Sequence, residues 1–368
     1  MKILFVEDNI EPIRGIIDHA DDNKWEHALS GFNEAPAKLV TENPDLVVLD
    51  WMYDAEHADE GEGIFSAIRE RIFIPTIIFS ALAGTLPDYI TSFVNDNPMM
   101  EIIPKGDEKK VIDCIEKWNP YLNSVKSARR ELNYALLLSA KAMGYFFEIN
   151  KNPGDGVLQY MLNKRVQYYL DEKMIEGENP PAWIEYDYPP INEGLFSADV
   201  LRLNNGNKNA VGKERDYFVI ISPSCDISRA IEKENQEYMV LVAQCESCHA
   251  LCKDMKIEED DSEEVISSKQ ERVRGFINTG YNYAKVPMPE LPGKIPYMTI
   301  NLKKVMLIKL GDIAYSEKDC IESTKYFRVA SISSPYRENI MWAHMINSCR
   351  PGMPNRNIDS WVDDITIE

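Results

Sequence analysis

The chain has 368 residues, of which 44% are hydrophobic, and its formal net charge is −20. This length predicts two or three domains, and the apolar fraction is large enough to form their cores. Most of the negative charge lies in residues 1–119. Nucleic-acid binding relies on neutralising phosphates with Lys and Arg, so the composition argues against a DNA-binding protein.

The chain begins at Met1 with an apolar segment that predicts a strand rather than a leader, and no apolar run reaches eighteen residues. We therefore expect neither export nor membrane insertion, and we expect a cytoplasmic location. Seven cysteines, an odd number, then favour reduced thiols or a metal site over a disulfide framework.

The first 119 residues alternate between short apolar runs and amphipathic stretches. The runs predict strands at 2–6, 25–29, 46–50, 75–80 and 101–104. The stretches predict helices at 10–22, 33–43, 61–71, 86–96 and 107–118. Such βα repetition predicts an α/β domain with a doubly wound, five-stranded parallel sheet covered on both faces.

Polar residues follow or end four of these runs, in the segments FVEDN, VVLDW, IIFSA and IIPKGD. The residues are Glu7, Asp8, Asp50, Ser80 and Lys105. The carboxyl ends of parallel strands share one edge of a sheet, where ligands bind. We therefore expect these five side chains to converge at one site.

Three carboxylates with a lysine and a hydroxyl suit a divalent cation and a phosphoryl group. A hard cation such as Mg²⁺ prefers oxygen ligands, which Glu7, Asp8 and Asp50 supply. Lys105 supplies a point charge for phosphate, and Ser80 can donate a hydrogen bond to a phosphoryl oxygen. Asp50 is placed to act as a nucleophilic carboxylate that forms an aspartyl phosphate.

This constellation resembles the receiver domain of bacterial two-component response regulators, which has a flavodoxin-like fold. The resemblance covers residues 1–119. It implies that Asp50 is the phosphoacceptor, that Ser80 and Lys105 contact the phosphate, and that the Met52 carbonyl joins Glu7, Asp8 and Asp50 in binding Mg²⁺. It further implies self-catalysed phosphotransfer and dephosphorylation, with a histidine kinase or phosphotransfer protein as partner.

Three departures from the receiver pattern bear on how a signal would leave the domain. The segment 51–63 is longer than usual and acidic, Gly106 follows the lysine where proline is common, and Ile102 stands where an aromatic switch residue is expected. Output could therefore run through the 82–98 segment instead. A degenerate receiver that keeps the fold without accepting phosphate is the alternative.

Residues 120–178 predict a helical linker. Pro120 is expected to end the preceding helix, and helices are predicted at 121–147 and 155–175. The first of these could form a dimer contact, giving a homodimer, or could pack against the rest of its own chain.

Residues 179–368 predict an α+β effector domain, a small twisted sheet or barrel. Strands are predicted at 217–222, 238–243, 298–309 and 326–332, and helices at 270–278 and over the segment that begins PYRENIMW. The acidic run IEEDDSEE that begins at Ile257 predicts a solvated loop.

Two cysteine-containing segments of this half are candidates for a reactive or metal-binding site. Cys225 and Asp226 follow an apolar strand in ISPSCDISR; a cysteine nucleophile there would need a base, His249 or His344, and the alternative is a buried thiol beside a turn. The spacing of Cys245, Cys248 and Cys252 suits zinc, with Cys225 or His249 as fourth ligand, although no second Cys-x-x-Cys pair follows. Ordinary thiols at a strand end are the alternative.

No phosphate-binding loop, cyclase signature, His-Glu-x-x-His motif or histidine kinase core is present. Three functions remain. The chain could be a response regulator whose phosphorylation on Asp50 switches a non-DNA-binding effector. It could be a receiver-gated enzyme that uses Cys225 or Asp226. It could also be a phosphate sink or adaptor of a signalling or defence module.

Overall fold

The computed structural model describes residues 1–51, 60–70, 73–148, 154–171, 180–206, 210–279 and 284–349, together with Val362 and Ile365. The chain divides into two compact units, Met1–Met174 and Ile175–Glu368, each with its own sheet. Within these described residues, no helix is both long and apolar enough to cross a membrane.

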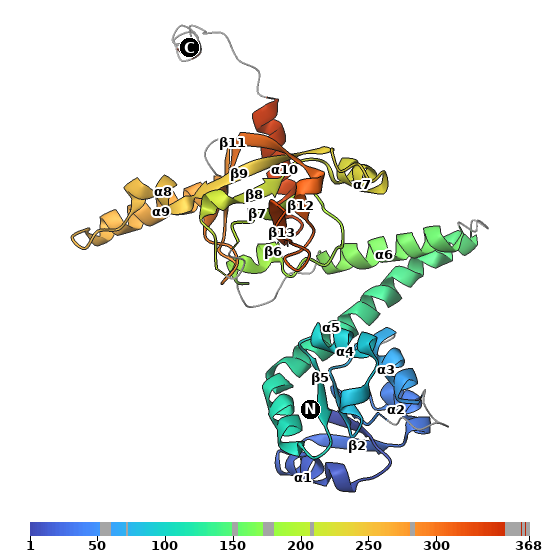
Figure 1. The fold of residues 1–368 in the computed structure, drawn as a ribbon. Helices are drawn as coiled ribbons and strands as arrows, with labels where there is room; N and C mark the ends of the chain where they lie inside the picture. The colour runs from blue at the N-terminus through green and yellow to red at the C-terminus, as the bar shows by residue number, and fades with distance from the viewer. Residues whose placement is uncertain are drawn as a thin grey trace. The chain divides into compact units, whose positions relative to one another are not determined.

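The first unit is built on a five-stranded sheet of order β2-β1-β3-β4-β5, and every neighbouring pair is parallel (Figure 1). The strands are β1 (Lys2–Val6), β2 (Glu26–Ser30), β3 (Leu46–Leu49), β4 (Thr76–Ser80) and β5 (Met100–Pro104). This strand order is that of flavodoxin-like folds. The doubly wound parallel sheet predicted from the sequence is therefore confirmed.

Helices cover both faces of this sheet, because its strands present apolar side chains on both sides. On one face, α1 (Arg14–Asp22) and the first part of α5 (Glu108–Glu148) bury residues such as Ile16 and Ile115. On the other face lie α2 (Ala35–Thr41), α3 (Glu60–Glu70) and α4 (Asp88–Asn95). The short 3-10 helices of this unit are η1 (Glu11–Ile13), η2 (Phe32–Glu34) and η3 (Ala83–Thr85).

Helix α5 runs without interruption through Pro120, so the prediction of two helices separated at that proline is wrong. Proline removes one backbone hydrogen bond from a helix and costs about 3 kcal/mol. Burial of side chains just before and just after Pro120 offsets this cost. Trp118 and Leu122 are 3% and 2% exposed and pack in the same core as Ile115, so one continuous face of the helix is buried.

The part of α5 beyond the sheet is fastened to the N-terminal end of β3. Lys126 forms an ion pair with the buried Asp45 at 2.7 Å, and Arg129 donates a hydrogen bond to the Pro44 carbonyl at 2.9 Å. The helix then packs against α6 (Asp155–Asp171), where the rings of Tyr134 and Tyr169 lie 6.0 Å apart. Large exposed apolar side chains remain on this helix pair: Leu132, Leu136, Leu137, Val157, Tyr160 and Tyr168.

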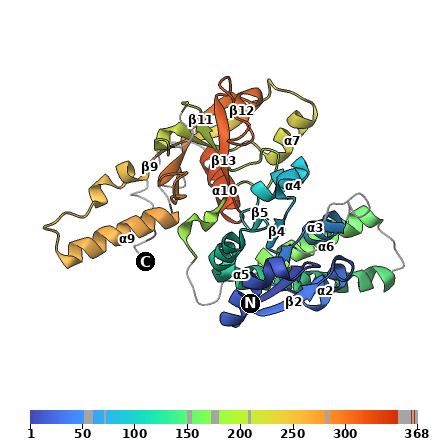
Figure 2. The same ribbon diagram turned by 60° about the horizontal axis from the view of Figure 1, so that its bottom comes forward.

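The second unit contains an eight-stranded sheet of order β10-β11-β9-β8-β7-β13-β12, with β6 also paired to β13 (Figures 1 and 2). All pairs are antiparallel except β12 with β13. The strands are β6 (Tyr186–Asp187), β7 (Asp199–Leu203), β8 (Tyr217–Ile220), β9 (Met239–Ser247), β10 (Lys285–Met288), β11 (Met298–Lys309), β12 (Ile313–Ala314) and β13 (Tyr326–Ile332).

Helices lie on both faces of this second sheet. Helix α10 (Tyr336–Ser348) buries Ile340 and Ala343 on one face, and α7 (Ser224–Glu232) buries Ile227 on the other. The remaining helices are α8 (Cys248–Leu251), α9 (Glu263–Thr279), η4 (Ala182–Glu185), η5 (Glu214–Asp216), η6 (Lys253–Met255) and η7 (Leu310–Asp312).

Helix α9 begins at Glu263, earlier than the predicted Gln270. The end of the acidic run therefore forms its first turn rather than a loop. Glu263 and Glu264 lie in that turn, where negative charge is favourable beside the unpaired N–H groups of a helix.

A buried ion pair between β7 and β13 also holds the segment that joins β6 to β7. Arg328 and Asp199 have side chains that are 4% and 0% exposed, and they meet at 3.4 Å. Arg328 also donates to the carbonyls of Tyr315 at 2.8 Å and Asn192 at 2.6 Å, while Asp199 accepts from Ser331 at 2.6 Å. Because each charge has further hydrogen-bond partners, burial of the pair is tolerated.

We predict that Arg328→Met destabilises the second unit by about 3 kcal/mol, because it leaves the Asp199 carboxylate buried without its cation. Amide hydrogen exchange of β7 and β13 in the full chain measures this loss. Arg337→Met is the matched control, since its pair with Glu338 is exposed and should be worth about 0.5 kcal/mol or less. Equal losses in the two variants would contradict the role given to Arg328.

Candidate functional site

Four strands of the first sheet deliver polar side chains to its carboxyl edge. Glu7 follows β1, Asp50 follows β3, Ser80 ends β4 and Lys105 follows β5. The backbone ladder continues up to this edge: the N–H of Asp50 donates to the carbonyl of Val6 at 2.9 Å, and the N–H of Lys105 to that of Ser80 at 3.1 Å. The side chains are therefore carried by rigid elements.

The ammonium of Lys105 lies between two carboxylates. Its Nζ atom is 2.7 Å from Asp50 Oδ2 and 2.8 Å from Glu7 Oε2. The three side chains are 19%, 11% and 4% exposed in the order Lys105, Asp50, Glu7. Three of the five residues predicted to converge thus form one charged cluster, in which the lysine offsets the repulsion between the two carboxylates.

Burial and the neighbouring charges act on the pKa values of this cluster. Burial raises the pKa of Glu7, the hydrogen bond from Lys105 offsets part of that rise, and the charge of Asp50 adds to it. Burial alone would lower the pKa of Lys105, but its bonds to Asp50 and Glu7 outweigh burial and raise that pKa. The lysine therefore stays charged at neutral pH.

A chain of hydrogen bonds links Asp50 to the segment after β4. The N–H of Trp51 donates to Asp50 Oδ1 at 2.8 Å, and the hydroxyl of Ser80 donates to the Trp51 carbonyl at 2.9 Å. The N–H of Leu82 in turn donates to the Ser80 hydroxyl at 3.3 Å. Ser80 is 1% exposed, so this hydroxyl is shielded from water as well as fixed.

The predicted metal ligands are only partly brought together. Glu7 and Asp50 meet at Lys105, and Glu7 also accepts from the N–H of Asn9 at 3.1 Å. Asp8 is exposed, and Met52 lies outside the described residues. Among the described residues, no three His, Cys, Asp or Glu side chains are grouped as metal ligands.

The chemistry of the edge nevertheless suits a hard cation. The available donors are carboxylate oxygens, which Mg²⁺ prefers. Positive charge is stabilised at this point, since the Lys105 ammonium contacts both carboxylates.

Gly31 also shapes this site, although no sequence pattern singles it out. It follows β2, and a Cβ atom there would lie 3.2 Å from Asp8 Oδ1. A side chain at this position would press on the Asp8 carboxylate. Trp51 likewise contributes through its carbonyl, a role that the residue type does not signal.

The first third of the chain is similar to receiver domains of solved structure. The N-terminal domain of the nisin resistance regulator NsrR, a lantibiotic response regulator, is 20% identical; the match covers 33% of this chain and 97% of that one, with a TM-score of 0.26. The N-terminal domain of a response regulator/sensory box/GGDEF protein from Carboxydothermus hydrogenoformans is 19% identical, covering 35% and 98%, with a TM-score of 0.27.

A third similar structure is the N-terminal domain of a response regulator receiver protein from Methanoculleus marisnigri JR1. It is 18% identical, covers 32% of this chain and 94% of that one, and has a TM-score of 0.24. No family model and no curated protein matches the chain. The fold of the first unit therefore rests on its own strand order, and these likenesses leave residues beyond it unassigned.

In the second unit, Cys225 lies in the first turn of α7 rather than in a buried turn. Its thiol is exposed and donates to Asp226 Oδ1 at 3.6 Å. His249 contacts the ring of Tyr297 at 6.2 Å, and His344 lies 3.4 Å from the Ser348 hydroxyl. In the described part of the chain, none of these contacts joins a histidine to Cys225, and a nucleophilic role for Cys225 stays a hypothesis.

The zinc site suggested by Cys245, Cys248 and Cys252 requires correction. Cys245 is 1% exposed and points into the apolar core of the sheet, where burial raises its pKa strongly. Cys248 and Cys252 lie beyond the end of β9, on α8 and directly after it, and are half-buried. The described residues therefore form no group of zinc ligands there.

We predict that Lys105→Met destabilises the first unit by about 2 kcal/mol at pH 7.5 without Mg²⁺, since Glu7 and Asp50 then lack a cation. A carboxyl whose pKa is raised by folding contributes stability below its unfolded pKa and loses it as pH rises through its folded pKa. Removing Lys105 raises the Glu7 pKa further. The deficit relative to wild type should therefore shrink when the pH is lowered to 5.5.

Urea unfolding at the two pH values measures this difference. Lys110→Met serves as control, because its ion pair with Glu101 is exposed and should be nearly neutral at both. A deficit for Lys105→Met that does not change with pH would contradict the coupling between Lys105 and Glu7.

Proposed function

We propose that the first unit is a working receiver, phosphorylated on Asp50 in a Mg²⁺-dependent reaction, and that its phosphorylation switches a non-DNA-binding second unit. The observation that carries this proposal is the contact of Lys105 with Asp50 beside Glu7 at the carboxyl edge of the sheet. A carboxylate, a fixed ammonium and a hydroxyl from three strands are the groups that accepting a phosphoryl group needs.

In this proposal a phosphohistidine of a histidine kinase or phosphotransfer protein is the donor. An oxygen of Asp50 attacks the phosphorus atom, and the bond from phosphorus to the histidine nitrogen breaks. Lys105 binds a phosphoryl oxygen and neutralises part of its charge. Its raised pKa keeps it protonated for this role.

Magnesium would be held by Asp8 and Asp50, with Glu7 in support. It would supply positive charge that offsets repulsion between these carboxylates and the incoming phosphoryl group. Glu7 is anchored for this role by the N–H of Asn9.

Ser80 is the proposed switch residue. Its hydroxyl donates to the Trp51 carbonyl and accepts from the N–H of Leu82. A phosphoryl group on Asp50 offers it a stronger, charged acceptor. Turning the hydroxyl toward that acceptor breaks its bond to Trp51 and shifts the segment from Leu82 through η3 and α4. This route does not need the aromatic residue that Ile102 replaces.

The output would pass through α5 and α6 to the second unit, or to a second copy of the chain. Supporting this, α5 is continuous from the core to the helix pair, and Lys126 and Arg129 clamp it to the sheet. The exposed apolar side chains of that pair offer a surface whose burial could change with phosphorylation, giving a homodimer in one state.

We predict that wild-type chain incubated with Mg²⁺ and acetyl phosphate gains one phosphoryl group by intact mass, because Lys105 and the metal together stabilise the transferring charge. Asp50→Asn should lose at least about 95% of this adduct, since its amide is not a nucleophile. Asp18→Asn, at an exposed position on α1, is the matched control and should behave as wild type. An adduct that persists in Asp50→Asn would contradict the assignment.

We predict that Ser80→Ala still forms the adduct but loses the response of residues 82–95 to it, because no hydroxyl remains to follow the phosphoryl group. Hydrogen exchange of this segment with and without beryllofluoride is the measurement. Ser80→Thr keeps the hydroxyl and should restore most of the response. If Ser80→Ala responds as wild type does, the signal leaves the site by another route.

A further inference from the structure

Among the described residues, the outer half of β11 has a neighbouring strand on one side only. Residues Val305–Lys309 pair with β9 on one side. On the other side, β10 pairs with Met298–Asn301, and the N–H of Leu302 donates to the Ala284 carbonyl at 2.9 Å. None of the described strands pairs with the remaining edge.

The backbone groups of this edge point outward in a regular order. The N–H of Leu310 donates to the carbonyl of Tyr238 at 2.9 Å. Hydrogen-bonded pairs alternate along an antiparallel ladder, so Ile308 and Met306 also bond to β9. The N–H and C=O groups of Val305, Leu307 and Lys309 must then face away from β9, where an added strand could bond to them.

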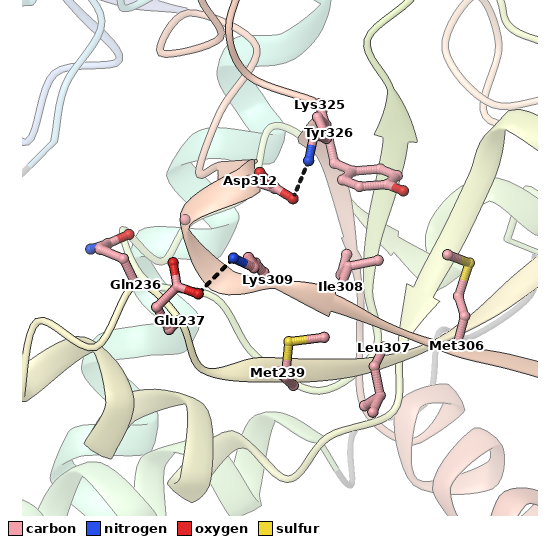
Figure 3. Close-up of a pocket in the computed structure, with 11 residues that line it drawn as sticks. Gln236, Glu237, Met239, Met306, Leu307, Ile308, Lys309, Asp312, Lys325 and Tyr326 are labelled. Atoms are coloured by element: carbon pink, nitrogen blue, oxygen red, sulfur yellow. Dashed lines mark hydrogen bonds and ion pairs between the residues drawn. The ribbon is translucent and has the colours of Figure 1, made fainter.

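The side chains along this edge are unusually apolar for an exposed strand. Val305, Met306 and Leu307 are 43%, 41% and 55% exposed, and Met239 beside them is 41% exposed. Met239, Met306 and Leu307 border a cavity of about 500 Å³ that is also lined by Tyr326 (Figure 3). An added strand would therefore cover apolar side chains as well as bond to the backbone.

Lysines lie at both ends of the apolar stretch (Lys303 and Lys304, then Lys309), and Lys325 lines the same cavity. Lys309 pairs with Glu237 at 2.6 Å and Lys325 with Asp312 at 2.9 Å (Figure 3). Lys304 lies 3.7 Å from Glu246, which also bonds to Lys285. The edge thus keeps positive charge on a chain of net charge −20.

We propose that Val305–Lys309 is a docking edge that an extended segment of a partner protein, with alternating apolar and acidic residues, joins as an added β-strand. Because side chains alternate between the two faces along a strand, its apolar side chains cover Met306 on one face of the sheet, and its carboxylates lie on the other face beside Lys309. A second copy of this chain suits the edge less well. Antiparallel pairing centred on Met306, for example, would place Lys303 opposite Lys309, and like charges directly opposite are destabilising.

The test measures fluorescence anisotropy of the full chain with a labelled peptide of sequence Glu-Val-Glu-Ile-Glu-Val-Glu. Two control peptides isolate the two parts of the proposal. One replaces every Glu by Lys, and the other carries N-methyl groups on alternate backbone amides, which removes its ability to pair along one edge. The acidic peptide should bind saturably and at least about tenfold tighter than either control.

Two protein variants locate the binding. Leu307→Pro removes an outward N–H without removing a bond to β9, and it should weaken binding about tenfold or more. Leu307→Ala keeps that N–H and should weaken binding only a few-fold. Lys303→Glu should weaken binding of the acidic peptide and strengthen binding of the lysine peptide.

The proposal is overturned if the acidic peptide shows no saturable binding, or if the N-methylated or lysine peptide binds equally well. It is also overturned if light scattering shows a dimer that Leu307→Pro abolishes, because a second copy would then be the occupant. The peptide comparison with the wild-type chain still tests the proposal even if Leu307→Pro does not fold.

Discussion

The ammonium of Lys105 lies between the carboxylates of Asp50 and Glu7, and the sheet and helices of the first unit hold these three side chains in place. Two buried carboxylates cannot stay charged side by side without a cation nearby. The parallel sheet places the Lys105 cation beside them, because it brings the ends of β1, β3 and β5 to one edge. The helices on both faces fix that edge, and the backbone ladder extends to the residues that carry the charges.

The same contact explains how the site could act as a switch. Lys105 and Ser80 are both committed to neighbours: the lysine to two carboxylates, the hydroxyl to the Trp51 carbonyl and the Leu82 N–H. A phosphoryl group on Asp50 would compete for both residues at once. Because Ser80 is bonded to the segment after β4, local chemistry at Asp50 would be converted into a displacement of backbone. The continuous α5 then offers a rigid path away from the sheet.

The sequence predicted the first unit well because its signals are local. Most strands there are short apolar runs, although β2 (EHALS) is not, and βα repetition makes the strands parallel, so the convergence of Glu7, Asp50 and Lys105 could be expected. The prediction that a helix ends at Pro120 failed because burial of Trp118 and Leu122 outweighs the local effect of the proline, and a local pattern does not show that burial. The hydrogen bond of Ser80 to a backbone carbonyl is invisible in sequence for the same reason.

The second unit was harder to predict because its elements depend on distant partners. The short strands β6, β10 and β12 form only by pairing with β13 and β11. The spacing of Cys245 and Cys248 suggested a metal, but alternation along β9 sends Cys245 into the core. The buried pair of Arg328 and Asp199 joins residues far apart in the chain, and no motif announced it.

Chemical trapping tests most directly whether Asp50 accepts a phosphoryl group. Borohydride reduces an acyl phosphate to an alcohol, so a phosphorylated aspartate becomes homoserine and can be located by peptide mass spectrometry. After treatment with acetyl phosphate and Mg²⁺, we expect homoserine at position 50 and at no other aspartate. Homoserine elsewhere, or none in a folded and Mg²⁺-loaded chain, would contradict it.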